Sequence, residues 1–372
     1  MFLELIERAT KQLQENLPFV LYRKPKEQTV NGIFQNDNQL HYVNDFTETG
    51  FVFAPFDTNS QIPILKIDEK YAVAYEIPNT ISSANSTDEV DESQKEFHIN
   101  LVEKGIQEIQ KGSFKKVVLS RKVEVACHTT GINLFKTLLN KYETAFCYIW
   151  YHAKTGLWLG ATPEILLQLQ NQQLTTMSLA GTKKYVENEN PNWGSKELEE
   201  QELVTQYITN AIAGSVSELN ILDRTSIKAG NLWHLRTKLT GTLLKGHLSK
   251  IVAKLHPTPA VCGMPMSATK AFIEKNENYN REYYTGYLGE LNFKIEKDRT
   301  RNRRNQENKA YRSIKTNTTF FVNLRCMQLK NEIAQIYIGG GITHDSDPEK
   351  EWQETVAKSN TMLQVLATSQ KK

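Results

Sequence analysis

The 372-residue sequence predicts an α+β fold with two mostly antiparallel sheets and flanking helices. Many strand-like segments follow one another after only a few residues, and such short connections favour antiparallel pairing because parallel neighbours need a longer crossover. Helix-like segments are also abundant, but they do not alternate regularly with the strands as they would in a chain of βαβ units. The length suits one large unit, so we expect a single domain over residues 1–372.

The first 90 residues contain regular structure but no recognisable chemistry. Residues 1–17 have the apolar spacing of an amphipathic helix, and residues 51–56 and 71–77 alternate like half-buried strands. Residues 82–94 are polar and acidic without apolar periodicity, which indicates a surface excursion or linker. We therefore place a boundary near residue 90 that need not separate independent domains.

From residue 95 onward the patterns become sharper. A helix begins there with Phe97, Leu101, Ile106 and Ile109 on its apolar side and ends near Gly112. Further helices are predicted over residues 131–141, 194–215, 266–275 and 348–368. Strands are predicted over residues 115–125, 146–152, 156–169, 173–182, 286–293, 319–329 and 332–343.

The composition excludes several classes of protein. The 39% hydrophobic and 23% charged content is ordinary for a globular chain, and no stretch approaches the roughly 20 apolar residues that a membrane helix needs. The N-terminus lacks the features of a secretion signal, so we expect a cytoplasmic protein. The four cysteines form no CxxC pair, which favours buried free thiols over a disulfide framework or a zinc site. No long apolar edge demands a partner, so we expect a monomer.

Two predicted helices each present a pair of carboxylates. Glu197 and Glu200 are three residues apart, as are Glu351 and Glu354, so each pair shares one helix face. Two such faces brought together would form the oxygen-lined site that Mg²⁺ prefers, completed by waters and an anionic substrate. The alternative is a solvated helix face, because charged pairs at this spacing are common on exposed helices.

Other candidates lie in apolar strands. The glycines around Gly340 and Gly341 would let backbone amides approach an anion closely, although a simple turn explains them equally well. Arg325 lies among apolar neighbours and needs a carboxylate partner from the protein or a ligand. Lys116 and Glu164 adjoin hydrophobic runs, and burial would suit them to act as general base and general acid. An ordinary strand-end position in water is the alternative for both.

Two further features are a histidine and a proline-rich loop. His234, in NLWHL, has the setting of an ordinary core histidine. Residues 256–265, HPTPAVCGMP, contain three prolines and one glycine, which specify a rigid loop able to hold a backbone edge against a ligand.

A non-enzymatic alternative comes from a basic segment. Residues 294–315 carry nine Lys and Arg side chains against three acids and could bind nucleic acid electrostatically. A solvated hairpin loop between two strands explains the segment as well. Because the net charge of the chain is only +3, we expect no nucleic-acid partner.

Taken together and in order, nine segments resemble those of the chorismate-binding enzymes. The segments are KVVLSR, GATPEILL, SLAGT, KELEEQELV, LWHL, HPTPA, LRC, GGGI and EWQETVAKS, spanning roughly residues 95–368. The resemblance implies the fold of anthranilate synthase component I, with residues 1–90 completing the sheets. It also implies a chorismate substrate and a bound Mg²⁺.

The resemblance assigns roles to the matched residues. It makes Glu200 and Glu354 direct Mg²⁺ ligands, with Glu197 and Glu351 acting through water. The group expected to hold the carboxylates of the substrate comprises Arg325, the amides around Gly340 and Gly341, Lys358 near the metal-bound end, and His234.

The family reaction, as the resemblance implies it, is attack of a nucleophile at ring C2 with loss of the C4 hydroxyl and a shift of the double bonds. It needs a base for the nucleophile and an acid for the leaving hydroxyl. Lys116 matches the base that activates water, and Glu164 matches the acid.

A few positions favour one activity within the family. Lys116 favours water over ammonia, which argues against an anthranilate synthase component I, and Ala180 argues against an aminodeoxychorismate synthase. Ala260 resembles isochorismate synthases, whereas Tyr284 is closer to salicylate synthases. We therefore predict an isochorismate synthase, with salicylate synthase as the main alternative. Menaquinone and siderophore routes use the same chemistry, so the sequence does not choose between them.

Overall fold

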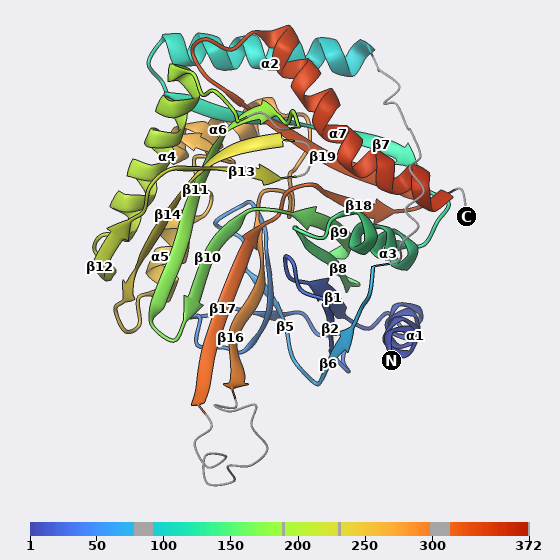
Figure 1. The fold of residues 1–372 in the computed structure, drawn as a ribbon. Coiled ribbons are helices and arrows are strands. Elements are labelled where there is room, and N and C mark those ends of the chain that lie inside the picture. The colour runs from blue at the N-terminus through green and yellow to red at the C-terminus, as the bar shows by residue number, and fades with distance from the viewer. Residues whose placement is uncertain (78–91, 188–189, 230–231, 298–312, 371–372) are drawn as a thin grey trace.

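The structure is a computed structural model that describes residues 1–77, 92–187, 190–229, 232–297 and 313–370. It has the predicted α+β architecture, with one nine-stranded and one ten-stranded sheet (Figure 1). The strand pairings between described residues are antiparallel, as the short connections predicted.

The nine-stranded sheet carries the strand expected to begin at Lys116 near one edge. Its order is β15 (Gly263–Met264), β7 (Lys116–Ala126), β19 (Ile333–Ile342), β18 (Cys326–Lys330), β9 (Gly156–Thr162), β8 (Phe146–His152), β1 (Phe19–Arg23), β2 (Thr29–Phe34) and β6 (Glu69–Ala74).

The ten-stranded sheet lies against the first. Its order is β12 (Val216–Ile221), β14 (Leu232–Leu243), β11 (Gln173–Lys184), β10 (Ile165–Gln170), β17 (Ser313–Val322), β16 (Tyr287–Lys297), β4 (Gly50–Ala54), β5 (Pro63–Leu65) and β3 (His41–Tyr42), with β13 (Thr225–Ala229) paired to β14. Strands β1 to β6 all precede residue 90 and divide between the two sheets. The N-terminal part therefore completes both sheets, as expected.

Helices cover the outer faces of the two sheets. On the nine-stranded sheet, α1 (Phe2–Gln14), α3 (Gly131–Lys141) and α7 (Pro348–Gln370) contribute to one apolar cluster, while α2 (Glu92–Gln110) packs along α7 and β7. On the ten-stranded sheet, α4 (Ser195–Ile212) and α5 (Leu248–Leu255) share a second cluster. Helix α6 (Met266–Asn276) packs beside β15 and β7.

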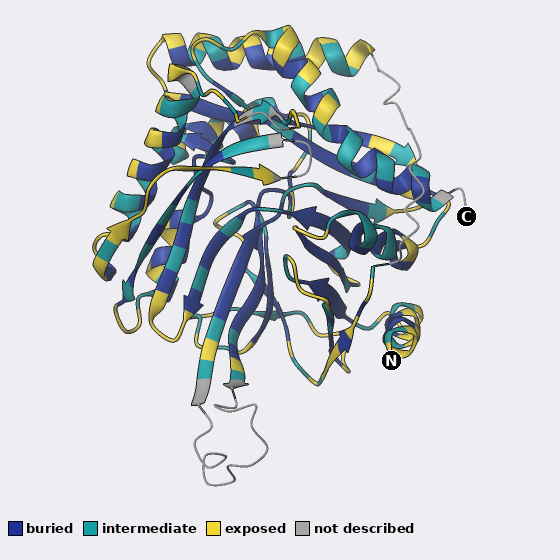
Figure 2. Cartoon of the chain, in the orientation of Figure 1, coloured by how far each residue is buried: buried dark blue, intermediate teal, exposed yellow. Residues whose placement is uncertain are grey.

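The inner faces of the sheets meet through aromatic side chains. Phe146 of β8 stacks on Phe321 of β17 with ring centroids 4.2 Å apart, and Phe53 of β4 stacks on Trp150 of β8 at 4.9 Å. These four side chains are almost completely buried, and the strands form the dark interior in Figure 2. Aromatic burial of this kind is a large contribution to folding free energy.

Two predicted strands are each divided by the structure. Residues 156–169 form β9 and β10, which belong to different sheets, and residues 319–329 form β17 and β18, which also belong to different sheets. Pro163 explains the first division, because proline cannot donate a ladder hydrogen bond. At the second division, Arg325 has a left-handed φ of 48° that a regular strand does not adopt.

Helix α2 differs from its prediction in one residue. Phe97 is 38% exposed, and the buried side chain at this end of the helix is its neighbour His98. The helix packs on both α7 and β7, and these contacts turn its buried face toward His98, Leu101 and Val102. The prediction for Leu101 and Ile109 is confirmed, since both are buried.

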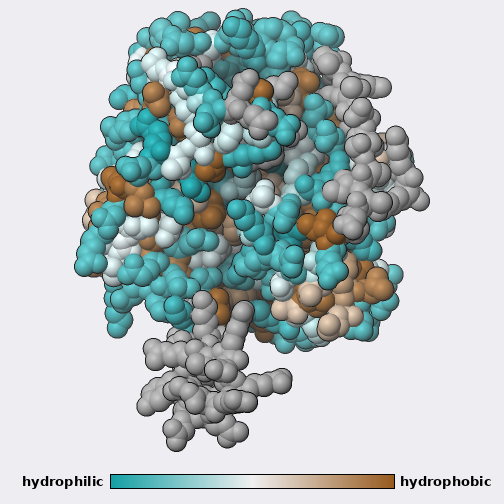
Figure 3. All heavy atoms as spheres, viewed as in Figure 1, coloured by the Kyte–Doolittle hydropathy of each residue, from teal (hydrophilic) through white to brown (hydrophobic). Residues whose placement is uncertain are grey.

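Other expectations concern cysteines, membranes and the two polar segments. The four thiols are free and buried, as predicted. No helix in the described part of the chain is both long enough and apolar enough to cross a membrane. Strands β16 and β17 pair as the predicted hairpin, but its basic tip, like most of the acidic 82–94 segment, lies outside the described residues. Hydrophilic residues dominate the face in Figure 3, with apolar residues in small separate groups.

Candidate active site

The two chain crossings between the sheets lie side by side. The Thr162 hydroxyl donates to the carbonyl of Val322 at 2.6 Å, and the Val322 amide donates to the carbonyl of Glu164 at 2.9 Å. The Ala161 amide donates to the carbonyl of Arg325 at 3.1 Å. These bonds fix Glu164 and Arg325 at one junction, although they are far apart in the sequence.

Glu164 is a buried acid beside two cations. Glu164 is 7% exposed. Burial raises the pKa of its carboxyl group to about 7, although the nearby charges of Lys116 and Arg325 act to lower it. Burial likewise lowers the pKa of Arg325, against the opposing effects of Tyr142 and Glu164. Within the described part of the chain, neither the Glu164 carboxyl group nor the Arg325 guanidinium has a hydrogen-bonded or ion-paired partner. The structure thus shows no internal ion pair for Arg325 among the described residues, and its role in binding a substrate anion stays a prediction.

Lys116 is the first residue of β7 and is 5% exposed. Its Nζ lies 2.5 Å from Oε1 of Glu200 on α4. A Cβ atom at Gly341 of β19 would lie 3.1 Å from Cε of Lys116 and 3.6 Å from Oε1 of Glu200. Glycine at this position therefore leaves room for the lysine and the carboxylate together.

One carboxylate of α4 and one of α7 lie beside neighbouring glycines of β19. Glu351 of α7 accepts a hydrogen bond from the Ser346 hydroxyl at 2.7 Å, and its Oε2 lies 3.5 Å from the Cβ position at Gly340. A Cβ atom at the next residue, Gly341, would lie 3.6 Å from Oε1 of Glu200 on α4. Successive residues of a strand point to opposite faces, so Glu351 and Glu200 lie on opposite sides of β19 near the same end of the strand.

The other two carboxylates of the predicted metal set make local contacts. Glu197 accepts from the Gly194 amide at 2.9 Å and so caps the start of α4. Glu354 pairs with Lys358 at 2.6 Å, and Lys358 also donates to the carbonyl of Gly339 at 3.0 Å. Both expected direct ligands, Glu354 here and Glu200 above, thus have a lysine partner.

The donor set is chemically suited to Mg²⁺, because it consists of carboxylates on two converging helices. Among the residues that the structure describes, no three His, Cys, Asp or Glu side chains stand close enough to hold a metal ion. Magnesium commonly uses only one or two protein carboxylates and takes its remaining ligands from water and substrate. The residues therefore fit the ion, and the metal site remains a prediction.

The edge of β19 next to the glycines is open. β18 pairs with β19 only from Ile333 to Ile336, whereas β7 pairs with it as far as Ile342. In an antiparallel ladder the N–H and C=O of one residue point to the same edge, and Gly339 directs its carbonyl to Lys358. Alternation therefore places the Gly341 amide on the open edge and the Gly340 amide against β7. Of the two amides expected to bind an anion, only that of Gly341 is oriented to do so.

His234 on β14 is close to the same groups. Burial lowers the pKa of its imidazole to about 4, the charges of Arg325 and Lys358 act in the same direction, and Glu354 opposes them. Nδ1 lies 3.2 Å from the carbonyl of Gly181, which can only accept, so Nδ1 carries the proton. The neutral ring then offers Nε2 as an acceptor, which suits a hydroxyl or water better than a carboxylate.

Two further positions, Ala260 and Tyr284, were expected to distinguish activities. Ala260 is half-buried in the loop between α5 and β15. Tyr284 is 3% exposed within the aromatic core, where it stacks on Tyr337 at 5.4 Å, and its hydroxyl lies 2.7 Å from the Cβ position at Gly339. The structure therefore places the Tyr284 hydroxyl beside the strand that carries the glycines.

Sequence reasoning missed one buried polar group beside the site. Glu277 and Arg281 form a bidentate ion pair whose side chains are 1% and 2% exposed. The available signal was their spacing of four residues, between the predicted helix at 266–275 and the predicted strand at 286–293. A surface groove between α4 and residues 221–224 contains none of the candidate residues, because it lies on the face of α4 opposite Glu200.

Comparisons with known proteins agree with this arrangement. A family model described as chorismate binding enzyme matches residues 57–297, and a second model with the same description matches residues 310–364. The chain is 28% identical over 264 residues to the isochorismate synthase EntC of Escherichia coli K12, a match that covers 68% of this chain. The match spans 62% of that protein, which is less than two thirds of its length.

Solved structures confirm the fold. DhbC of Bacillus anthracis superposes with a TM-score of 0.76 at 21% identity, covering 96% of this chain and 99% of that one. Anthranilate synthase component I of Streptococcus pneumoniae superposes with a TM-score of 0.64 at 16% identity, covering 93% and 92%. The prediction of a two-sheet fold like that of anthranilate synthase component I is therefore confirmed.

Proposed function

Because this chain belongs to the chorismate-binding enzymes, we propose that it is an isochorismate synthase. The reaction adds water at C2 of chorismate, shifts the ring double bonds and releases the C4 hydroxyl. The observation that carries the proposal is that Lys116 is buried near Glu164. The Glu164 carboxyl group has a pKa of about 7, so its protonated form exists at neutral pH. A base and an acid are the two groups that this exchange of hydroxyls requires.

Each proton has a stated source and destination in this proposal. Lys116 removes a proton from water as the oxygen forms its bond to C2, and Glu164 gives a proton to the C4 oxygen as its bond to carbon breaks. The electron pairs of the double bonds move between these two carbons, so the product is an isomer of the substrate. Nothing is oxidised or reduced.

The anionic groups of the substrate would meet the cations of the site. Arg325, which has no partner among the described residues, is suited to the enolpyruvyl carboxylate together with the Gly341 amide. Lys358 and Arg325 both lie near His234, because the charge of each lowers the pKa of its imidazole. This arrangement supports a substrate with two carboxylates.

Glu200 and Glu354 would bind Mg²⁺ directly, with Glu197 and Glu351 acting through water. The ion, when bound, would neutralise the ring carboxylate of chorismate. Carboxylates of α4 and α7 lie near the same end of β19, at Gly341 and Gly340, and this supports the assignment. Metal binding would also release Lys116 and Lys358 from their carboxylate partners.

The test is to incubate the purified protein with chorismate and Mg²⁺, without ammonia, and to identify the products by chromatography and mass spectrometry. Isochorismate without pyruvate is the expected result. Salicylate with pyruvate would instead establish the alternative that Tyr284 leaves open, and unchanged chorismate would refute both. An added ammonium salt should give no anthranilate, because Lys116 serves water chemistry.

A further inference from the structure

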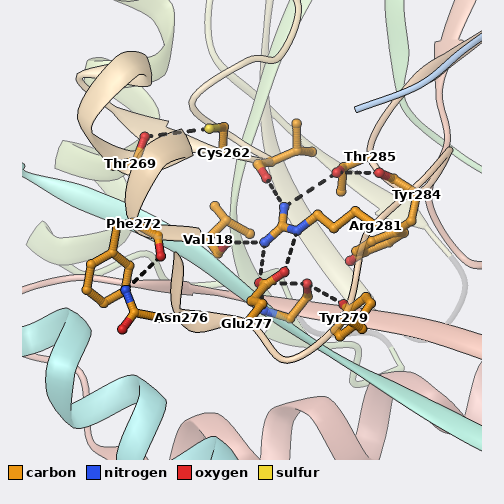
Figure 4. A network of polar contacts seen from close by, with 12 residues as sticks. Val118, Cys262, Thr269, Phe272, Asn276, Glu277, Tyr279, Arg281, Tyr284 and Thr285 are labelled. Atoms are coloured by element: carbon orange, nitrogen blue, oxygen red, sulfur yellow. Dashed lines mark hydrogen bonds and ion pairs between the residues drawn. The ribbon is translucent and has the colours of Figure 1, made fainter. Parts of the chain in front are cut away.

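A buried ion pair lies beside the candidate site and has no place in the chemistry above. Arg281 and Glu277 meet through two bonds, Nε to Oε2 at 2.8 Å and Nη2 to Oε1 at 2.5 Å (Figure 4). Both residues are less than 9% exposed. Burying two charges costs free energy that a pair of this kind only partly recovers, so its presence calls for an explanation other than stability.

The guanidinium of Arg281 uses all of its donors. Besides its bonds to Glu277, Nη2 donates to the carbonyl of Val118 at 2.7 Å and Nη1 donates to the carbonyl of Val261 at 3.0 Å. Nη1 also lies 3.4 Å from the Thr285 hydroxyl oxygen. Five N–H groups thus have five acceptors, and only the planar fork of arginine can supply this set.

Glu277 completes the same connection from the other side. Its Oε1 accepts from both the amide and the hydroxyl of Ser120, each at 2.8 Å. The Ser120 hydroxyl also bonds the Tyr279 hydroxyl at 2.6 Å. The Glu277 carboxylate therefore binds the backbone of β7. Figure 4 shows Glu277 and Arg281 pointing toward that strand.

Arg281 and Glu277 bind the edge of β7 at the point where the short strand β15 ends. β15 pairs with β7 only at Lys116 and Val117, and the last backbone bond of this edge joins the Val118 amide to Cys262. The next groups on the same edge, the Val118 carbonyl and the Ser120 amide, are bound by Arg281 and Glu277. The ion pair thus replaces the missing backbone of an edge strand.

These contacts lie next to Lys116 and next to the two positions expected to distinguish activities, Ala260 and Tyr284. Val118 follows Lys116 by two positions on β7, and Val261 directly follows Ala260. The Tyr284 amide donates to the carbonyl of Arg281 at 2.8 Å. A single guanidinium therefore connects the base, the loop of Ala260 and the turn of Tyr284.

We propose that Arg281, held by Glu277, is a positioning residue that fixes the Lys116 end of β7 against the loop of Ala260. The inference rests on the proposed function and extends it to residues outside the substrate's reach. Arg281 sets where the lysine amine stands relative to the bound ring, and it contributes to water attack rather than to substrate affinity. Displacements of about 1 Å in a reacting group can cost roughly 10²-fold in rate.

The test compares Arg281→Lys with a matched control, Gln12→Met. Lysine retains the charge and one bond to Glu277 but cannot bridge Val118 and Val261 together. Gln12 is also fully buried and donates to two backbone carbonyls, those of Pro18 and Gln35, but on α1 at the opposite edge of the sheet. Both variants lose bonds to the backbone, and only one loses them beside Lys116.

For Arg281→Lys we expect kcat to fall on the order of 10²-fold, with KM for chorismate changed by less than about three-fold because Arg325 and Lys358 are untouched. Gln12→Met should retain the wild-type kcat despite a lower melting temperature. Hydrogen exchange followed by mass spectrometry should become faster in peptides covering residues 116–121 and 258–262 only in Arg281→Lys.

Three outcomes have distinct meanings. If Arg281→Lys keeps the wild-type kcat, or if its exchange is unchanged in both peptides, the inference is wrong. An equal loss of kcat in Gln12→Met would reduce the role of Arg281 to general stability and would also overturn it. A wild-type protein without turnover would refute the proposed function instead, and the exchange data would still decide whether Arg281 fixes the two segments.

Discussion

Burial gives Glu164 its unusual acid strength. A glutamate in water has an ordinary pKa of 4.5 and would be almost fully ionised at neutral pH, unable to donate a proton. In the junction between the sheets its pKa rises to about 7, because the loss of water outweighs the attraction of the nearby cations. The structure thus supplies an acid at the pH where a cell would need one.

The pH dependence of turnover should reflect this acid. We expect kcat/KM for chorismate to fall as the pH rises through about 7, because the deprotonated form of Glu164 cannot protonate the leaving hydroxyl. A pH–rate profile between pH 5 and 9 measures this limb. A profile that stays level across neutrality would show that another group donates the proton.

The same carboxyl group should make folding stability depend on pH. Its folded pKa exceeds its unfolded value, so its contribution is fully present below about pH 4.5 and is lost as the pH rises through about 7. Urea unfolding should show wild type losing on the order of 3 kcal/mol relative to Glu164→Gln between those pH values. Parallel stability curves for the two proteins would contradict the raised pKa.

Lys116 can be tested against a lysine on its own strand. Lys116→Ala should lower kcat by on the order of 10²–10⁴, because water then lacks a general base. Lys122→Ala is the control, since Lys122 also lies on β7 but pairs with Glu124 at 2.9 Å, away from the glycines. Full activity in Lys116→Ala would mean that another group activates water.

At the scale of elements, α4 and α7 carry the predicted metal ligands, two on each helix. Glu200→Gln or Glu354→Gln should weaken Mg²⁺ binding at least as much as the 10–100-fold typical of outer-shell changes, and should abolish turnover. Calorimetric titration with Mg²⁺ in the presence of chorismate measures the affinity.

A control for the metal variants lies on the same helix. Glu202 is two residues beyond Glu200 and pairs with Arg224 at 3.1 Å on the opposite face of α4. Glu202→Gln should therefore bind Mg²⁺ and turn over like wild type. An equal loss in this variant, or normal Mg²⁺ binding in Glu200→Gln, would remove the assignment.

The sequence predicted elements better than it predicted where they cross. The helix over residues 131–141 and the strand over residues 146–152 were predicted to the residue. The helix has the apolar spacing of one buried face, and the strand is an apolar and aromatic run buried on both faces. The strand over residues 156–169 was wrong in one respect, since the apolar run continues across the crossing while the chain changes sheets. Pro163 was the available signal.

The site was predicted as residue types but not as a geometry. Carboxylates at a spacing of three do share a helix face, and Arg325 does lack a partner among the described residues. The sequence could not reveal that Glu277 and Arg281 complete the edge of β7, because that edge is formed by residues distant in the chain. Nor could it show which glycine amide faces the open edge of β19, which depends on strand register.

At the scale of the whole molecule, the aromatic interface joins the N-terminal strands to the rest. β1 and β4 contribute Tyr22 and Phe53 to the cluster that also contains Phe146, Trp150 and Phe321. Residues 1–90 carry none of the candidate catalytic groups, yet β1 and β4 supply large side chains to the interface between the sheets. Function at one end of the molecule therefore depends on packing supplied by the other part of the chain.

A chain of residues 95–372 should not fold on its own, although it contains all the candidate site residues. This fragment lacks β1 to β6, so the aromatic cluster would be exposed and new strand edges would be unpaired. Both changes favour aggregation. Size-exclusion chromatography and near-ultraviolet circular dichroism against the full chain provide the measurement. A monomeric, cooperatively unfolding fragment would show that residue 90 is a true domain boundary.

The paired crossings at Glu164 and Arg325 also determine when in folding the protein acquires its chemistry. Neither crossing can form its hydrogen bonds until strands from both sheets stand in place, and those strands come from distant parts of the chain. Contacts between such distant segments form slowly because long loops must close first. The junction that holds Glu164 and Arg325 is therefore expected to form late in folding, after strands of both sheets have paired.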